Sequence, residues 1–486
     1  MKRNSFGEAV LFVLLGVCPI LLAAGQAQAE DIYYAQAPAG SGGGESCANA
    51  RAISDLAWGP GTGSIGAGDT AHLCGTIATA ITVGASGSDT NNQVTVKFED
   101  NAKMSKDTWG DGGAAITISG NSWVVIDGGT NGIIESTDVG SAKTYRHNNT
   151  GVVISGTSSD IEVRNLTIPQ LYSRTRSNSA DFAGNGIKLN QGTLSNIRIH
   201  HNTLSKAKVL IYVVYRAHSN IRIYNNTLMH GAAGIIVGDP TSNSTIDTLE
   251  LYNNTINLYD DAADLKCTNT YHNDGIHFWA VASGSSYRNV KVYGNTIGPD
   301  MGACTATTGW IFLEDTRSNI LIYNNLLLAN DSNRCPTDAM VYDKGDGSAS
   351  NNGAQIYNNT FAYVGGSRKG CTGVEVQEGG EIVKNNIFTN LNYAVYGGPI
   401  ASPFTSDHNL YSNNNNNVEG KSKDPHGIYK NPSLDANYRY LSAASPGVHA
   451  GADLSAFFTT DKDGNARTLP WDIGAYIYPG GASRAQ

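Results

Sequence analysis

A repeated alternation of apolar and polar residues dominates the middle of the chain. Eight segments share the form apolar-x-apolar-x-x-Asn-x-apolar, such as "IRIHHNTL" at 197–204 and "LELYNNTI" at 249–256. Alternation with a period of two predicts a β-strand, and the Asn marks a bend after it. One marker Asn per segment gives Asn165, Asn202, Asn226, Asn254, Asn295, Asn325, Asn359 and Asn386. Their unequal spacing indicates one coil per repeat, with loops of different lengths.

A second set of short strands lies between these segments, for example "DGIHFW" at 274–279 and "AMVYDKG" at 339–345. Two short strands per irregular period, with no amphipathic helix between them, exclude an α/β fold and a leucine-rich horseshoe. We therefore expect an all-β chain, a right-handed parallel β-helix whose coils form a single solenoid and lie about 4.8 Å apart. The marker Asn residues should stack into a ladder, which explains their N-x-T patterns better than glycosylation does.

The two ends of the chain depart from the repeat. Residues 1–29 combine a basic start, an apolar run and "AQA", which is the layout of a secretory signal peptide. We expect a secreted protein, extracellular or periplasmic, with no membrane attachment after cleavage. The N-terminal cap and first coils should span 30–100, the β-helix 101–410 and a C-terminal capping tail 411–486. A short amphipathic helix at 47–58 is expected to plug the first coil.

Cysteine usage supports an oxidising compartment. Six of the seven cysteines lie beyond the leader, an even number that predicts disulfides in an exported chain. No CxxC pair occurs, which disfavours a zinc site built on cysteine. Positions in the cap and in the loops of neighbouring coils predict the bridges Cys47–Cys74, Cys267–Cys304 and Cys335–Cys371.

The charge balance narrows the class of partner. The net charge is −9 and the chain has only 33 Lys and Arg residues, with no basic stripe. We therefore do not expect a nucleic-acid partner, because binding nucleic acid requires a concentrated positive surface. We expect a monomer.

Alternation in the second set of strands predicts the residues of a groove. The inward-facing side chains are expected to be Ile276, Phe278, Ile311, Leu313, Met340, Tyr342, Val374 and Val376. The outward file then contains Gly238, Trp279, Glu314, Asp343 and Gln377, beside a file with His277 and Glu375. Glu314 and Asp343 would lie about 5 Å apart on adjacent coils. One of two such close carboxyls should hold a proton while the other stays ionised, as glycosidic cleavage requires.

Candidate roles follow from this groove. The expected catalytic residues are Glu314, Asp343, His277 and Asp274. The expected substrate-binding residues are Trp279, Trp310, His272, Lys344, Arg317 and Glu375. Capping of the turn is a competing role for Asp274, which precedes its strand. No metal ligands are predicted among these residues and no cofactor is required, but Ca²⁺ stays open: Asp260, Asp261 and Asp264 could bind it, although no EF-hand-like spacing supports this.

The solenoid and its groove resemble the pectate-lyase-like superfamily of polysaccharide lyases and glycosidases. The segment "NDGIH" at 273–277 is also similar to part of "NTDGIH" in polygalacturonase-type hydrolases. The "DD", "GHG" and "RIK" motifs that follow it in that family do not follow it here. The resemblance implies a secreted carbohydrate-active protein with a polysaccharide substrate.

Three functions remain open. The first is a glycoside hydrolase that uses Glu314 and Asp343. The second is a lyase that cleaves a uronate polymer by β-elimination, with a base and a charge neutraliser drawn from His277, Tyr215, Lys188, Lys344, Arg216 and Arg317, and with Ca²⁺ screening the carboxylates. The third is a non-catalytic carbohydrate-binding protein that uses the tryptophans. The acidic groove ranks the hydrolase first, because it would repel an anionic substrate.

Overall fold

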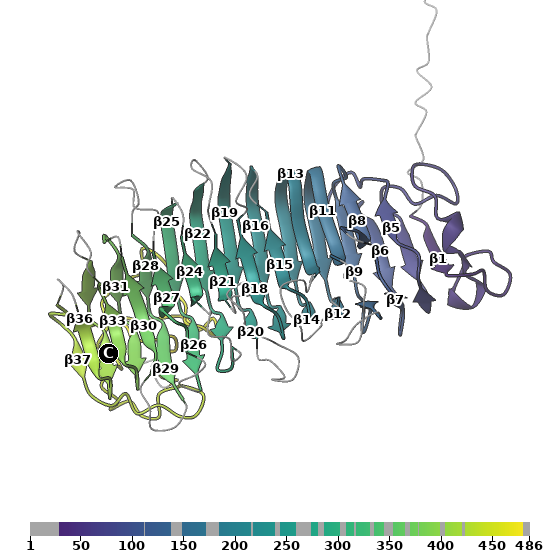
Figure 1. Cartoon of the computed structure of the whole chain (residues 1–486). Helices are drawn as coiled ribbons and strands as arrows, with labels where there is room; N and C mark the ends of the chain where they lie inside the picture. The colour runs from purple at the N-terminus through teal and green to yellow at the C-terminus, as the bar shows by residue number, and fades with distance from the viewer. Residues whose placement is uncertain are drawn as a thin grey trace, which may run out of the picture.

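The computed structural model describes residues 29–110, 112–137, 148–171, 184–214, 217–238, 244–258, 274–279, 286–301, 308–314, 317–330, 335–344, 353–364, 370–377, 379–398, 404–419 and 423–479. Within these ranges the chain winds into an elongated solenoid of parallel strands, from β1 (Asp31–Ala35) at one end to β37 (Ile428–Tyr429) at the other (Figure 1). The expected all-β parallel β-helix is therefore confirmed.

The solenoid has three faces rather than the two strands per coil that the sequence predicts. The first face contains β5 (Ile81–Val83), β8 (Ala114–Ser119), β15 (Val209–Val213), β18 (Ala233–Val237), β21 (Asp274–Phe278), β24 (Gly309–Leu313), β27 (Ala339–Asp343), β30 (Thr372–Val376), β33 (Tyr393–Tyr396) and β36 (Asn416–Glu419). These are mainly the second set of strands of the sequence pattern. Two long strands, β11 (Thr150–Arg164) and β13 (Asn185–His200), continue from this face onto the next.

The repeat segments form the other two faces. The second face contains β1, β2 (Arg51–Ala52), β3 (Thr70–Leu73), β6 (Val94–Phe98), β9 (Val124–Asp127), β16 (His218–Tyr224), β19 (Thr245–Tyr252), β22 (Ser286–Tyr293), β25 (Arg317–Tyr323), β28 (Gln355–Tyr357), β31 (Ile382–Lys384) and β34 (Thr405–Asp407). The third face contains β4 (Thr76–Ile77), β7 (Lys103–Lys106), β10 (Ile133–Ser136), β12 (Thr167–Gln170), β14 (Thr203–Ser205), β17 (Thr227–Met229), β20 (Thr255–Asn257), β23 (Thr296–Ile297), β26 (Leu326–Ala329), β29 (Thr360–Tyr363), β32 (Ile387–Thr389), β35 (Leu410–Ser412) and β37. The extra strand arises because the chain turns at the marker Asn and extends again directly after it.

The marker Asn residues form the expected ladder at this corner. In Asn254, Nδ2 donates to Asn295 Oδ1 at 3.0 Å and to the carbonyl of Ile223 at 2.9 Å. The same amide-to-amide bond joins successive members from Asn202 through Asn226, Asn254, Asn295, Asn325, Asn359 and Asn386 to Asn409. The marker Asn165 is wrong by one position, because Leu166 occupies the ladder position of that coil and its backbone N–H donates to Asn202 Oδ1.

The residue before each ladder member makes the turn itself. Asn165, Asn225, Asn253 and Asn324 have φ between 53° and 58°, a left-handed conformation that Asn tolerates better than most residues. The recurrent "NN" pair thus divides two tasks, with the first Asn turning the chain and the second joining the ladder.

A continuous apolar core fills the solenoid. The inward file of the first face contains Ile235, Ile276, Ile311, Val341 and Val374, all fully buried and paired in register. Each coil adds one such layer, and one buried cluster runs from Ile32 to Tyr411. Burial of apolar surface therefore stabilises the fold layer by layer.

The helix expected at 47–58 is wrong. The segment forms two short 3-10 turns, η1 (Cys47–Asn49) and η2 (Ile53–Asp55), on either side of strand β2. Tertiary pairing overrides the amphipathic pattern, because Arg51 and Ala52 pair in parallel with Tyr34 and Ala35 of β1.

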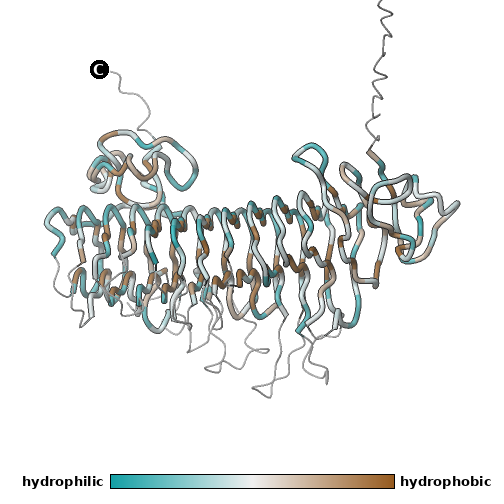
Figure 2. Tube along the Cα trace, turned by 90° about the horizontal axis from the view of Figure 1, so that it is seen from above, coloured by the Kyte–Doolittle hydropathy of each residue, from teal (hydrophilic) through white to brown (hydrophobic). Residues whose placement is uncertain are grey.

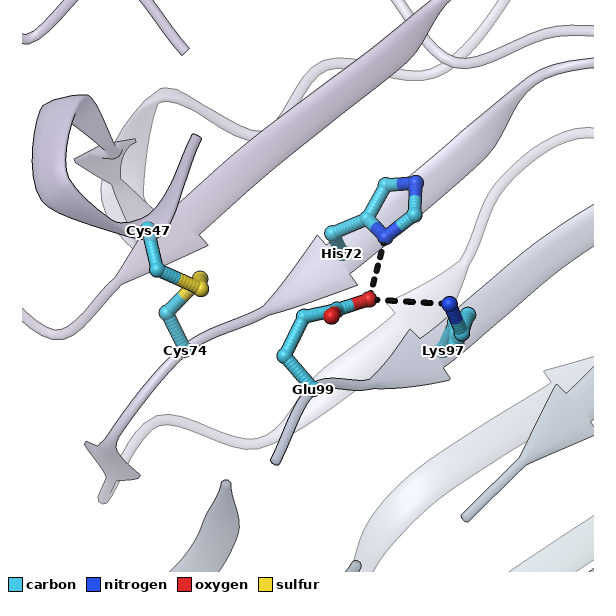
Figure 3. The surroundings of a disulfide bond; sticks show 5 residues. All are labelled: Cys47, His72, Cys74, Lys97 and Glu99. Atoms are coloured by element: carbon cyan, nitrogen blue, oxygen red, sulfur yellow. Dashed lines mark hydrogen bonds and ion pairs between the residues drawn. A yellow bond between two sulfur atoms is a disulfide. The ribbon is translucent and has the colours of Figure 1, made fainter. Parts of the chain in front are cut away.

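Two of the three expected disulfides are present. Cys47 and Cys74 are bridged near the N-terminal end, with 5.5 Å between their Cα atoms. Figure 3 shows this bridge near Glu99, which accepts from His72 Nδ1 at 2.6 Å and from Lys97 Nζ at 3.1 Å. Cys335 and Cys371 are bridged with 5.2 Å between their Cα atoms. The expected Cys267–Cys304 pair lies outside the described residues.

The C-terminal segment after β37 folds back along the side of the solenoid (Figure 2). Asn324, Asn358 and Asn385 donate to backbone carbonyls of this segment, at Thr460, Asp472 and Ala452 respectively. Phe458 and Trp471 pack on a patch of the second face that includes Tyr323. In the part of the chain that the structure describes, no helix has the length and apolar composition needed to span a bilayer.

Candidate functional site

Strand β21 begins with a buried carboxylate that serves two partners. Asp274 Oδ1 accepts the backbone N–H groups of Thr308 and Gly309, each at 3.0 Å, and so caps the start of β24 in the next coil. Its second oxygen, Oδ2, lies 3.2 Å from His277 Nδ1. Asp274 thus fixes both the backbone of the neighbouring coil and the orientation of an imidazole.

His277 links two carboxylates. Its Nε2 lies 3.0 Å from Glu314 Oε2, and its ring stacks on Phe312 with 4.5 Å between ring centroids. Burial alone would lower the pKa of His277, but its hydrogen bonds to Asp274 and Glu314 outweigh burial and raise the pKa to about 9. The imidazole is therefore a cation at neutral pH.

Glu314 directly follows β24 and is held by two cations. Its Oε2 contacts His277, and its Oε1 accepts from Lys344 Nζ at 2.9 Å. Burial would raise the pKa of Glu314, but the two cations lower it below its usual range. The carboxylate is thus ionised, with 15% of its side chain exposed.

A cavity of about 410 Å³ opens over this network. Its lining includes Lys208, Val209, Ala232, Ala233, Ile236, Asp274, His277, Trp279, Phe312 and Glu314. These residues come from four successive coils, β15 to β24, and span three spacings or roughly 14 Å along the axis. The cavity has the length to accept several consecutive rings of a polymer that runs along the solenoid.

The predicted pairing of Glu314 with Asp343 is wrong. Asp343 pairs with Leu313 and Val376, both inward-facing, and its side chain has no exposed surface. The residue beside Glu314 on the next coil is Lys344, whose N–H bonds to the carbonyl of Leu313. Alternation alone places Asp343 outward, but Arg317 neutralises its charge inside the coil and so permits its burial.

The same register error exchanges Tyr342 and Val341 of β27, and two further residues are buried for other reasons. Tyr342, expected inside, faces outward and stacks on Phe312 with 5.0 Å between centroids, whereas Val341 is buried in the core. Trp310, expected in the groove, is fully buried in the core and does not line the cavity. Arg317 is also buried and does not line the cavity.

Two titratable residues of this region, Lys208 and Asp338, do not follow from the sequence pattern. Lys208 and Asp338 each precede a first-face strand, β15 and β27, and occupy equivalent positions of their coils. Enclosure of its ammonium group lowers the pKa of Lys208, although the side chain remains exposed overall. Burial and the negative charge of Asp274 raise the pKa of Asp338, against the opposing charge of Lys344. The only sequence signal was their shared place before the strand.

Glu375 faces outward beside Tyr342, as its predicted file requires. Burial raises its pKa, while a hydrogen bond from Gln377 Nε2 at 3.0 Å works in the opposite direction. Lys188 lies in the same outward file, three coils from His277, with its Nζ 5.5 Å from the ring centroid of Tyr212.

Several predicted residues lie outside the described ranges: His272, Tyr215, Arg216, Asp260, Asp261 and Asp264. Ca²⁺ binding by the three aspartates therefore stays a prediction. The carboxylates that line the cavity do not fit a calcium site as they stand. The oxygens of Asp274 and Glu314 already contact backbone N–H groups, His277 and Lys344.

Comparisons with known proteins agree with the architecture. No protein-family model matches the chain, and no curated protein matches it in sequence. Among solved structures, XylC in complex with xylose aligns with a TM-score of 0.51 at 10% identity, over 92% of this chain and 98% of that one. The GH136 lacto-N-biosidase from Eubacterium ramulus aligns with a TM-score of 0.50 at 11% identity, over 82% and 67% of the two chains. Pectate lyase Pel9A aligns at 13% identity with a TM-score of 0.45, over 93% and 98%. At such identities the similarity to the first two establishes a shared fold, the parallel β-helix.

Proposed function

We propose that the protein is a secreted glycoside hydrolase that acts on a long polysaccharide. The observation that carries this proposal is the ionised Glu314 at the cavity wall, which contacts His277 and Lys344. A second carboxyl, that of Asp338, has a raised pKa and interacts electrostatically with Asp274 and Lys344 of the same network. Glycosidic cleavage needs one carboxylate that stays ionised and one carboxyl that keeps its proton.

Glu314 acts as the nucleophile or base. Asp338 acts as the proton donor, the role first expected from the Glu314–Asp343 pair. Its pKa responds to Lys344 and Asp274, which both belong to the network around Glu314. His277 positions Glu314 and keeps it ionised, and Trp279 offers a ring on which a sugar stacks.

Export fits the same proposal. The N-terminal leader pattern and two disulfides suit an extracellular or periplasmic protein. A polymer too large to enter a cell is degraded there, and a groove that crosses several coils suits such a substrate.

A second function, β-elimination of a uronate polymer, is favoured by one observation. Lys208 lines the cavity and burial lowers its pKa, as a lysine that takes a proton from carbon requires. His277 and Lys344 would then neutralise the uronate carboxylate. The hydrolase ranks first because both of these cations already contact Glu314.

A panel of neutral and acidic polysaccharides separates the candidates. Incubation with the mature protein should release reducing ends without the ultraviolet absorbance of an unsaturated uronate. Reducing ends together with that absorbance would replace the hydrolase by the lyase. Retardation in polysaccharide gels without any cleavage would leave a binding protein.

Variants assign the roles. Glu314→Gln and Asp338→Asn should each lower turnover by about a hundredfold or more, because each removes one partner of the acid–base pair. Glu250→Gln is the matched control, since Glu250 lies on the second face and also contacts two cations, Arg222 at 3.5 Å and Lys291 at 3.8 Å. Full activity of both groove variants would reject this site.

A further inference from the structure

Two histidines and an aspartate converge near the C-terminal end of the solenoid. Asp407 is the last residue of β34, His408 follows it, and His426 lies between β36 and β37. His426 Nδ1 lies 2.7 Å from Asp407 Oδ1, and His408 Nδ1 lies 3.0 Å from the same oxygen. We propose that these three side chains bind a divalent transition-metal ion, with Zn²⁺ as the first candidate.

The donor set matches this class of ion. Imidazole nitrogen and carboxylate oxygen are favoured zinc ligands, and three protein ligands leave one position for water. The three ligand atoms lie within 4.8 Å of one another, so one ion can reach all of them after a small adjustment. Soft metals that prefer sulfur are disfavoured, because the described part of this cluster contains no cysteine.

The contacts around the three side chains also fit. His408 Nδ1 is buried and lies 3.0 Å from Asp407 Oδ1, so both atoms can bind the same ion. Lys384 Nζ lies 3.6 Å from Oδ2 of Asp407 and therefore leaves Oδ1 for the metal.

The cluster lies where the solenoid needs closure. Two residues before His426, Asp424 Oδ2 accepts from Asn409 Nδ2 at 2.9 Å and from Tyr411 Oη at 2.8 Å, so this segment covers the end of the Asn ladder. The rings of His408 and His426 stack with 4.5 Å between centroids. A metal ion that joins His426 to Asp407 and His408 would fasten the covering segment to the last coils, since an open solenoid end exposes its core.

The test uses the full-length mature protein, without an affinity tag and treated with chelator. Calorimetric titration with ZnCl₂ should give one equivalent bound, and thermal unfolding should shift to higher temperature with Zn²⁺. With CoCl₂, a visible absorption band of a low-symmetry site with nitrogen ligands should appear. None of these readouts depends on enzymatic activity, so the outcome is independent of the proposed function.

Variants define the site. His426→Ala and Asp407→Asn should each weaken binding by about tenfold or more and abolish the cobalt band. His449→Ala is the control. His449 is also a histidine of the C-terminal segment and lies 3.5 Å from a carboxylate, that of Asp472, but it does not belong to the group of three ligands. Circular dichroism verifies that each variant is folded. Absence of saturable binding by the wild type, or equal binding by folded His426→Ala, would overturn the proposal.

Discussion

Arg317 and Asp343 form an ion pair inside the solenoid, and neither side chain has exposed surface. Arg317 begins β25 on the second face, whereas Asp343 ends β27 on the first face. Asp343 Oδ2 also accepts the backbone N–H of Ala354 at 3.3 Å. The pair therefore joins two faces from within the core and makes Asp343 a structural residue.

Removing one member of this pair should destabilise the protein strongly. Arg317→Met or Asp343→Asn leaves the other group buried without its partner, at a cost of about 3–5 kcal/mol in the free energy of unfolding. The double variant Arg317→Met/Asp343→Asn should cost less than the sum of the two single changes. Urea unfolding followed by circular dichroism measures all three, and additive costs would argue against a coupled pair.

The raised pKa of His277 predicts that the stability of the protein depends on pH. Its pKa of about 9 in the folded protein exceeds the value near 6.5 expected on unfolding. The protonated His277 therefore adds roughly 3 kcal/mol to the free energy of unfolding. This contribution is fully present below about pH 6.5 and is lost as the pH rises through about 9.

The measurement compares the wild type with His277→Gln. The difference in unfolding free energy between the two proteins should shrink steadily over this pH range. Since other groups titrate in both proteins, their effects cancel. A constant difference would mean that the imidazole is not held as a cation between Asp274 and Glu314.

The Asn ladder predicts a contrast between adjacent asparagines. Asn254→Ala removes the acceptor of the N–H and Nδ2 groups of Asn226, both buried, and should cost about 2–4 kcal/mol. The exposed neighbour Asn253 only turns the chain, with φ of 53°, so Asn253→Gly should change stability by less than about 1 kcal/mol. Thermal unfolding of both variants measures the contrast, and equal losses would contradict the division of tasks.

Truncation of the two tryptophans should affect different properties, stability for Trp310 and polysaccharide binding for Trp279. Trp310→Ala should lower the free energy of unfolding by about 3–5 kcal/mol, because the indole fills the core. Trp279→Ala should leave stability nearly unchanged and weaken polysaccharide binding by about tenfold, because its ring lines the cavity. Affinity electrophoresis and thermal unfolding separate the two effects. Unchanged polysaccharide retention by Trp279→Ala would exclude stacking there.

The solenoid and its ladder were predictable because the repeat is local. Each segment carries its own alternation and its own Asn, so no long-range information is needed to recognise the coil. The ladder failed only at Asn165, where the neighbouring Leu166 takes the ladder position and the amide pattern is broken. The helix at 47–58 failed because pairing of Arg51 with Tyr34 decides the conformation.

The groove was predictable only in part, because its register depends on distant partners. His277 and Glu314 follow from the alternation of their own strands and do line the cavity, and Asp274, expected just before its strand, lines it as well. Asp343 does not, because its inward orientation depends on Arg317 from another strand. Local alternation cannot show which charge will find a partner in the core. Lys208 and Asp338 precede their strands, where alternation has not yet begun.

The direction of the ladder bonds has an electrical consequence. From Asn202 onward each side-chain amide donates one hydrogen bond to the next ladder member toward the C-terminal end and accepts one from the member before it, and the last amide, in Asn409, donates to the carboxylate of Asp424. Aligned amide dipoles add along the axis and polarise one another, as peptide dipoles do in a helix. The column therefore has a positive pole, and the anion of Asp424 neutralises that pole at the place where stacking stops.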